Sequence, residues 1–413
     1  MSKNKQNMGR IMDKPNHMQK EKPSLKLAKD IPPKELRKRK VRRIIGRIRK
    51  TLSLLLFLAM VILGNYILLT IRFHENARTG SIYLHATTET SNYEVFNNGI
   101  VRYNRDRVAF LNLRNREQWT WGAQFENPIF TASAQSFAIA DKGGHQIMVF
   151  NQGGLIGEFE TIFPIEQIAI SNHGIVSVIL RNPENPLIMI YDATGMLLVE
   201  NHVPFSTLGY PTALALSHDG TTLVVGYLSI NGGRIQSTVV HYNFNDPQNT
   251  RSDFVVHSEE LDNTIIVELF FVNEKTSVAI TDSSFIIFEG IEAPRREVQV
   301  FFREEIKSVF YTENYIGYVL QIDDQIGYEL RLHNSRGDIV MSRQFIGEYS
   351  NIQMIGNDIF MFDGFALCII NKHGVLRFQG NIDVNPLLVM PAAGINRFHV
   401  MSTYDLRTIN LVR

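Results

Sequence analysis

The residue types that most often perform catalysis or bind metals are present, but their spacing does not form a site. The 12 histidines are scattered without the H-x-x-x-H or H-x-H spacing of a metal site. The single cysteine, Cys368, lies in the apolar run FALCIIN and is interpreted as a small buried hydrophobic residue. The sequence contains neither a G-x-S-x-G elbow nor a glycine-rich phosphate loop. It therefore predicts no catalytic residue, no metal site and no cofactor.

Two further features have a structural and a functional interpretation. Trp119 and Trp121, the only tryptophans, stand at i and i+2 and hence on one face of a strand. They could form a ligand platform, but large aromatic side chains on an outer strand more often pack against the next sheet. The clusters GGLIG and NGGR occur at strand ends, where hairpin geometry explains their glycines. We prefer the structural interpretation of both features.

A segment without charge, residues 51–71, follows a densely basic one. Ten of the 17 residues from Lys34 to Lys50 are Lys or Arg, and the next 21 residues carry no charge. As a helix, residues 51–71 would rise about 31 Å, enough to cross a hydrocarbon core of about 30 Å. A cleaved signal peptide is disfavoured because the apolar core is too long and no A-x-A pattern follows it. The segment predicts a transmembrane helix.

The charges on either side of this segment predict its orientation. Residues 1–50 carry 18 Lys and Arg against 4 Asp and Glu, whereas residues 51–413 carry 24 against 37. The positive-inside rule then places residues 1–50 in the cytoplasm and the body outside a single-pass cell membrane protein. Residues 1–33 lack periodicity and predict a disordered tail. Residues 34–50 predict a basic amphipathic helix that lies on anionic inner-leaflet lipids before the chain turns into the span, a better fit than nucleic acid.

The body has the pattern of a repeated β-structure. From about residue 80 onward, short apolar alternations are separated by turn residues, which predicts an all-β fold. Four strands end in Asn or Asp with Gly three residues later, so that the side chain caps the turn and the glycine adopts a positive φ. The pairs are Asn151/Gly154, Asp192/Gly195, Asn334/Gly337 and Asn371/Gly374. Their spacing fits a period of roughly 40–50 residues, which is typical of β-propeller blades.

Eight four-strand units can be assigned, and seven is the alternative because the fourth and fifth units are the least regular. The eighth unit, PLLVMP, NRFHVMS and DLRTINLV, lacks its fourth strand. The strand SIYLHATT, residues 81–88, precedes the first complete unit, and we expect it to close the ring by covering that bare edge. The propeller is thus predicted over residues 81–413, with residues 72–80 as a linker.

The repeats and the overall order of segments also resemble known families. IYDATGMLLVE resembles the strand-turn-strand of quinoprotein-like propeller repeats, and LALSHDGTTLVVGYL resembles WD-repeat strands. The order of basic tail, span and a propeller opening with QWTWGAQFENPIF resembles a family of membrane-anchored propeller proteins of Gram-positive (Firmicutes-type) anaerobic bacteria. That resemblance covers nearly the whole chain and implies the fold and the anchor, but no activity.

Propellers usually bind through the loops that join second to third strands and one blade to the next. Here those loops are ADKGGH, RNPENP, SINGGR, QIDDQ, VPFSTLGYP and SEELDN. An acidic face with two aromatic residues fits a basic partner or a polar envelope component, although solvated loops are often acidic in any case. The candidate contact residues are Asp141, Asn182, Glu184, Phe205, Tyr210, Asn231, Glu259, Glu260, Asp323 and Asp324.

These patterns predict a membrane-anchored extracytoplasmic propeller that acts as a binding or scaffolding module of the bacterial cell envelope. Its partner would be an envelope protein or polymer. The alternative is an extracytoplasmic propeller enzyme, quinoprotein-like or a hydrolase, although one cysteine cannot supply the adjacent pair that some quinoproteins use. An enzyme should show polar residues converging on the central channel, whereas a scaffold should show a broad interactive face.

Overall fold

The computed structural model describes six stretches of the chain, residues 33–70, 72–85, 90–202, 208–245, 254–322 and 327–412. The predicted tail, residues 1–33, lies outside these stretches except for Pro33. The chain divides into two compact units, Met1–Tyr66 and Ile67–Arg413. The first unit contains most of one helix, and the second contains all the described strands.

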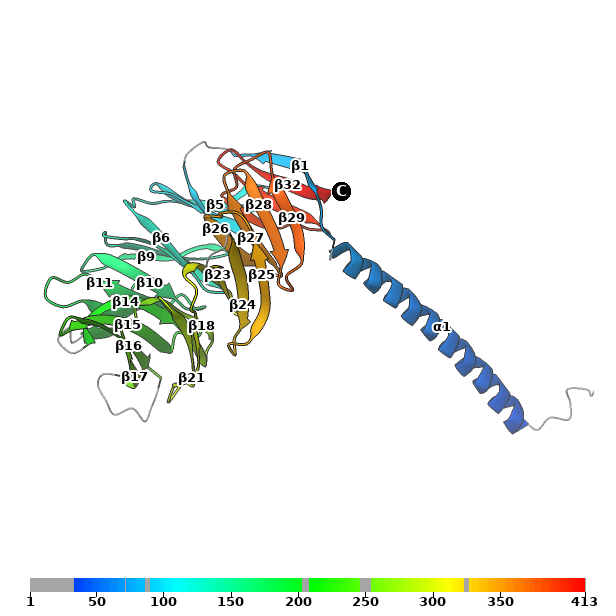
Figure 1. Ribbon diagram of the computed structural model, residues 1–413, viewed down its shortest axis with the longest axis horizontal. Helices are drawn as coiled ribbons and strands as arrows, with labels where there is room; N and C mark the ends of the chain where they lie inside the picture. Colours follow the sequence, from blue (N-terminus) through cyan, green and yellow to red (C-terminus); the bar gives the residue numbers. More distant parts are fainter. Residues whose placement is uncertain are drawn as a thin grey trace, which may run out of the picture. The chain divides into compact units, whose positions relative to one another are not determined.

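The helix α1 runs without interruption from Pro33 to Thr70 (Figure 1). Proline is favoured at the first helical position because its missing N–H would have no partner there. Within α1, Ile44–Asn65 has a mean hydropathy of 1.6, is not buried, and is long and apolar enough to cross a membrane. The sequence suggested a surface helix that turns into the span near Lys50, whereas α1 continues through that point. No proline interrupts the helical pattern there.

The described strands form eight four-stranded antiparallel sheets, each a blade of a β-propeller (Figure 1). The first strands, which line the centre of the ring, are β2 Asn92–Phe96, β6 Pro128–Ala132, β10 Ile165–Ile170, β14 Tyr210–Leu216, β18 Ile266–Asn273, β22 Ile306–Tyr311, β26 Asn351–Ile355 and β30 Leu388–Pro391. The second strands are β3 Gly99–Tyr103, β7 Ser136–Asp141, β11 Val176–Leu180, β15 Thr222–Asn231, β19 Thr276–Thr281, β23 Tyr315–Gln321, β27 Asp358–Asp363 and β31 Arg397–Met401.

The outer half of each blade consists of a third and a fourth strand. The third strands are β4 Arg107–Asn112, β8 Gln146–Asn151, β12 Leu187–Tyr191, β16 Arg234–Asn243, β20 Ser284–Glu289, β24 Tyr328–Asn334, β28 Ala366–Asn371 and β32 Asp405–Val412. The fourth strands are β5 Glu117–Gly122, β9 Gly154–Glu160, β13 Leu197–His202, β17 Val255–Asp262, β21 Arg295–Phe301, β25 Ile339–Phe345, β29 Leu376–Asn381 and, for blade 8, β1 Asn76–Leu84. The eight-bladed propeller agrees with the count favoured by the sequence.

The ring is closed by β1, which pairs with β32 as the outer strand of blade 8. The ladder runs antiparallel from Asn76 opposite Val412 to Leu84 opposite Asp405. This strand begins five residues before the predicted closing segment, residues 81–88, because β32 offers hydrogen-bonding partners as far as Val412. Residues 86–89 lie outside the described chain. The linker predicted over residues 72–80 is therefore largely part of the closing strand.

Contacts from blade 1, from blade 7 and from the connection between blades 7 and 8 hold β1 and the residue His74 before it in place. The Asn115 side-chain amide of blade 1 donates to the carbonyls of Tyr83 at 3.0 Å and Leu84 at 3.1 Å. The Thr79 hydroxyl donates to Asp383 at 2.8 Å, and the amide of His74 donates to the carbonyl of Arg377 at 2.9 Å. These bonds add to the β1–β32 ladder, which covers the edge that β32 would otherwise expose.

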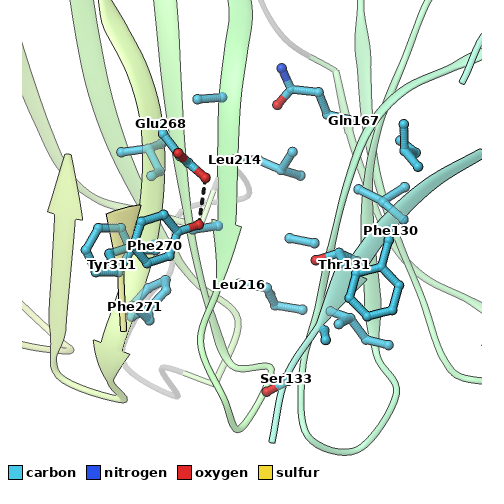
Figure 2. Close-up of a pocket in the computed structure, with 18 of the residues that line it drawn as sticks. Phe130, Thr131, Ser133, Gln167, Leu214, Leu216, Glu268, Phe270, Phe271 and Tyr311 are labelled. Carbon is cyan, nitrogen blue, oxygen red and sulfur yellow. Dashed lines mark hydrogen bonds between the residues drawn. The ribbon is translucent and has the colours of Figure 1, made fainter. Parts of the chain in front are cut away.

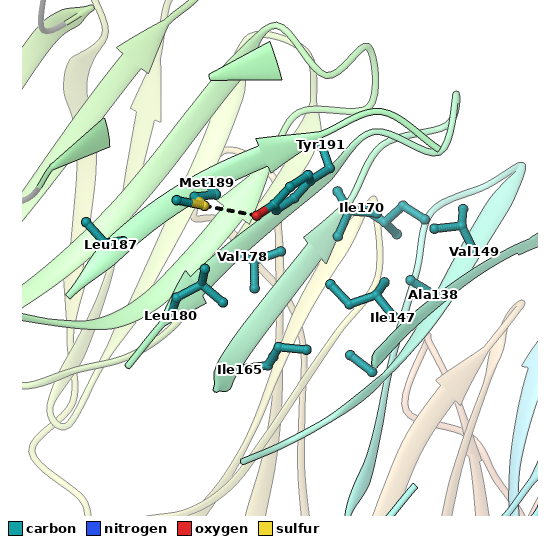
Figure 3. Packing of buried hydrophobic residues seen from close by; sticks show 12 residues of the cluster. Ala138, Ile147, Val149, Ile165, Ile170, Val178, Leu180, Leu187, Met189 and Tyr191 are labelled. Carbon is teal, nitrogen blue, oxygen red and sulfur yellow. Dashed lines mark hydrogen bonds between the residues drawn. The ribbon is translucent and has the colours of Figure 1, made fainter. Parts of the chain in front are cut away.

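The hydrophobic core lies between neighbouring blades. Each sheet packs its two faces against the sheets on either side, so residues that alternate in direction along a strand are both buried. Figure 3 shows this for blades 2 and 3, where Ala138 and Ile147 face Ile165 and Val178. This arrangement explains why β11 and β12 are buried along their whole length and have continuous apolar sequences.

The predicted turns join the third and fourth strands of their blades. In the turn after β12, Asp192 accepts hydrogen bonds from the amides of Thr194 at 2.8 Å and Met196 at 2.9 Å, while Gly195 has a φ of +92°. The same pattern occurs at Asn334 and Asn371. Blade 1 has a fifth such turn, after Asn112, that the sequence search missed because Asn115 takes the positive φ instead of glycine.

Antiparallel blades place their connections on two opposite faces. The turn face contains the turns between first and second strands and between third and fourth strands. The loop face contains the loops between second and third strands and between blades. The strand β1 begins beside Val412, the last residue of β32, so the chain reaches the propeller on the turn face.

Candidate functional site

The predicted contact residues are spread over several blades. Asp141 is buried, and its Oδ1 accepts hydrogen bonds from the amides of Glu126 at 2.9 Å and Asn127 at 2.7 Å. This carboxylate therefore fixes the loop between blades 1 and 2. Asn182 and Glu184 lie on the loop face of blade 3, where Glu184 is exposed.

The structure places the other predicted residues differently. Glu259 and Glu260 were expected in a loop between blades, but both belong to β17, where they pair with Val239 and Thr238 of β16. Asn231 ends β15 and lies opposite Arg234, and the two glycines between them have positive φ, as a tight hairpin requires. Phe205, Asp323 and Asp324 lie outside the described residues.

The hairpin formed by β15 and β16 extends beyond its neighbours on the loop face of blade 4. Its flanking strands β14 and β17 pair only as far as Leu228 and Gln236. Ile230 and Ile235 are directly opposite each other near the tip, and Ile230 is 72% exposed. The amide of Asn263 donates to the carbonyl of Ile235 at 2.9 Å, which brings the exposed Ile265 to the base of the hairpin. Ile230, Ile235 and Ile265 form what we call the isoleucine patch.

Other large apolar side chains are exposed in the connections of the loop face. Besides Ile265, the described connections of this face expose Ile162, Ile346, Phe365, Leu387 and Tyr404. The described connections of the turn face expose two, Met196 and Ile395, and its adjoining outer strands begin with the exposed Leu197 and Ile339. These residues are spread over several blades, whereas the isoleucine patch belongs to blade 4 and the connection that follows it. Apolar residues that are exposed close together are typical of surfaces that bind other proteins.

A second candidate site is the central channel. Beside first strands of blades 1 to 6 lies a cavity of about 780 Å³. Its wall combines polar groups with apolar side chains, and Phe130, Leu214, Leu216 and Phe270 are among the apolar lining residues (Figure 2). A cavity of this size is within the range of small-molecule sites.

Four neighbouring blades have a β-bulge at the same place in the first strand. The extra residues are Glu166, Thr212, Val267 and Lys307 in β10, β14, β18 and β22. A bulge redirects side chains, and here it leaves consecutive residues such as Val267 and Glu268 both facing the channel. At this position Glu166, Gln167 and Glu268 contribute polar groups to the channel wall.

Near the loop face, Glu166 is held by two neighbours. It accepts hydrogen bonds from Tyr210 and, at 2.5 Å, from Arg181. Burial and the hydrogen bond to Glu166 raise the pKa of Tyr210 to about 12, so the phenol remains a donor. Of these three residues the sequence singled out only Tyr210.

On the opposite wall, Glu268 of blade 5 accepts a hydrogen bond from the hydroxyl of Tyr311 of blade 6 at 2.6 Å (Figure 2). The Tyr311 ring stacks on Phe270 with 3.9 Å between centroids. Desolvation by the channel wall, and then the charge of Glu268, raise the pKa of Tyr311. Sequence reasoning missed this pair, although a glutamate that interrupts the apolar strand IVELFFVN is a usable signal.

The described residues contain no group of three or more His, Cys, Asp or Glu side chains that could hold a metal ion. Burial raises the pKa of the Cys368 thiol to about 12, which keeps it protonated. Trp119 stacks on Phe150 and Phe110 and packs against the core, as the structural interpretation expected. Trp121 is 43% exposed, so that interpretation does not extend to it.

The fold defines an eight-bladed β-propeller with an apolar helix at its N-terminal side. The chain resembles Sqt1 from Saccharomyces cerevisiae, at 11% identity and a TM-score of 0.55 over 83% of this chain and all of that one. It also resembles BamB from Moraxella catarrhalis (12%, TM-score 0.48, covering 81% and 100%) and apo AztD from Citrobacter koseri (11%, 0.49, 72% and 87%). At 11% identity, the likeness to Sqt1 shows the fold alone.

The family is shown by the sequence. Residues 72–411 match the model described as a family of unknown function, DUF5711, and the chain belongs to that family. The matched residues cover the closing strand and every blade. No curated protein matches the chain.

Proposed function

We propose that this protein is a membrane-anchored binding module of the bacterial cell envelope. The apolar window Ile44–Asn65 in α1 crosses the cell membrane once, with the basic residues before it in the cytoplasm and in contact with anionic inner-leaflet lipids. The propeller lies outside the cytoplasm. The excess of acidic over basic residues after residue 50 supports this orientation.

The loop face binds the partner, and the isoleucine patch is the observation that carries this assignment. The hairpin extends past its flanking strands and presents two isoleucines on a tight turn, an arrangement that places apolar area where a partner can cover it. Because the chain reaches the propeller on the turn face, the loop face is at the other end of the blades. The partner is an envelope protein with an apolar contact surface.

Photo-crosslinking tests this proposal. A photoreactive amino acid replaces Ile230 in the full-length chain in native membranes, and a matched chain carries it at Met196, which is exposed on the turn face. We expect a discrete protein adduct from position 230 that is several-fold stronger than any from position 196. The added substitution Ile235→Asp should remove the adduct. Equal adducts from both positions, or no adduct from position 230, would show that the loop face is not the binding surface.

A further inference from the structure

We propose that the central channel binds a small organic cation with an apolar body, and that Glu268 is the residue that receives its charged group. This inference concerns a different part of the propeller from the isoleucine patch and does not depend on the proposed partner.

The Glu268 carboxylate is held at the cavity by a neighbouring blade. The side chain is exposed to the channel, and the Tyr311 hydroxyl donates to its Oε1 at 2.6 Å. That bond holds the carboxylate through Oε1 at the edge of the cavity, which Glu268 and Tyr311 both line (Figure 2). A fixed carboxylate in a partly enclosed site favours a cationic donor, because a charge-assisted hydrogen bond is about twice as strong as a neutral one.

The side chains around Glu268 determine which kind of ammonium group and which apolar body fit the cavity. Phe270 and Tyr311 form a stacked aromatic pair beside it, and Leu214 and Leu216 provide an aliphatic wall. Aromatic rings next to a carboxylate suit organic ammonium groups, which gain from both the charge and the π-systems. The cavity of about 780 Å³ is large enough for an apolar body beyond the ammonium group.

The other charged groups that line the cavity also favour a cationic ligand beside blades 5 and 6. Glu166 already accepts from Tyr210 and Arg181, so its charge is compensated within the wall. Glu313 lies near the turn face of blade 6, and Lys142 lies on blade 2. The wall formed by blades 5 and 6 thus contributes two carboxylates, and the lining residues contributed by those blades include no Lys or Arg.

A matched series of probes tests the proposal with the full-length chain in lipid nanodiscs. Phenethylammonium, 2-phenylethanol and phenylacetate share a ring and a similar length but differ in charge. Binding is followed by ligand-observed NMR, and empty nanodiscs give the background from partition into lipid. We expect the cation to bind about tenfold more tightly than the alcohol, a difference of about 1.4 kcal/mol, and the anion to bind most weakly.

Two substitutions locate the site. Glu268→Gln keeps the shape and an acceptor for Tyr311, and we expect it to reduce the affinity for phenethylammonium to that for 2-phenylethanol. Glu260→Gln removes a carboxylate from β17, outside the cavity, and should leave all three affinities unchanged. Equal binding of cation and alcohol to the unsubstituted protein, no binding of the cation, or an undiminished affinity in Glu268→Gln would each overturn the proposal.

Discussion

Gly195 contributes both to a turn within blade 3 and to the packing of blade 3 against blade 2. It closes the turn after Asp192 with a φ of +92°, and a Cβ there would lie 2.5 Å from the Cβ of Phe159 in blade 2. The turn is therefore also a contact between blades. The spacing of Asp192 and Gly195 predicted the positive φ, but the contact with Phe159 depends on how two blades pack and could not be predicted.

The substitution Gly195→Ala should destabilise the propeller through both effects. We expect a loss of about 2–4 kcal/mol in the free energy of unfolding, from backbone strain and overpacking together. Gly143→Ala is the control, because Gly143 has a φ of +88° but nothing within 4 Å of the added Cβ. It should cost about 1 kcal/mol. Denaturant titration of the full-length chains measures both, and equal losses would contradict the contact with Phe159.

His241 makes the stability depend on pH. It is buried between blades 4 and 5, where its Nε2 lies 2.9 Å from the hydroxyl of Ser277. Burial, and then the nearby His257, lower the pKa of His241 to about 3. Glu259 and Arg296, which pair with each other beside His257, complete the charged groups at this position.

The sign of this pH dependence follows from the protonation of His241 in the folded and unfolded states. Between pH 6.5 and about 3, the unfolded chain binds a proton at His241 that the folded chain excludes. The free energy of unfolding should therefore fall with decreasing pH in this window, by about 1.4 kcal/mol per pH unit from this residue. The substitution His241→Gln should reduce the slope of stability against pH. An identical slope in the variant, measured by denaturant titration at several pH values, would refute this assignment.

At the scale of elements, the closing strand β1 is held by side chains as well as by its ladder. Asn115 contributes two hydrogen bonds to β1, and its φ of +57° suits asparagine or glycine. The sequence predicted that a strand before the first blade closes the ring, since blade 8 lacked one. The predicted strand starts at residue 81, whereas β1 starts at Asn76. The start was misplaced because the alternation in SIYLHATT is clearer than that in the preceding NARTG.

Asn115→Gly isolates the side-chain bonds from the backbone conformation. We expect it to lower the free energy of unfolding by about 1–2 kcal/mol, the range for losing one to two hydrogen bonds. Asn97→Gly is the matched control, because Asn97 has a φ of +50° and is exposed in a turn of the same blade. A similar result for both variants in thermal unfolding would mean that Asn115 does not hold β1.

In blade 4, the sequence pattern does not distinguish a solvated loop from an outer strand. The acidic run containing Glu259 and Glu260 resembles a solvated loop, yet both residues lie on the outer strand, where one face meets solvent. In the same way, Glu268 and Tyr311 are 43 residues apart and meet only because blades 5 and 6 are neighbours.

At the scale of the whole molecule, the period of the turns and of the short strands favoured eight blades over seven. The count rests on a local pattern that recurs in several blades, so it needs no knowledge of tertiary contacts. The cavity could not be predicted in this way, since its shape depends on bulges at one position in four first strands. The isoleucine patch could not be predicted either, because the strand pattern does not show where the β15–β16 hairpin extends past β14 and β17.

We propose above all that the propeller and the basic N-terminal segment, residues 1–50, lie on opposite sides of a membrane. The native Cys368 is buried, which keeps the labelling background low. Ser283 is exposed on the loop face, so Ser283→Cys reports on the propeller, and Ser2→Cys reports on the N-terminal segment.

Labelling of intact, wall-free cells with a membrane-impermeant maleimide is the most direct test. With the proposed topology, we expect Ser283→Cys to react in intact cells and Ser2→Cys to react only after the cells are lysed. Reaction of Ser2→Cys in intact cells, with Ser283→Cys protected until lysis, would contradict it.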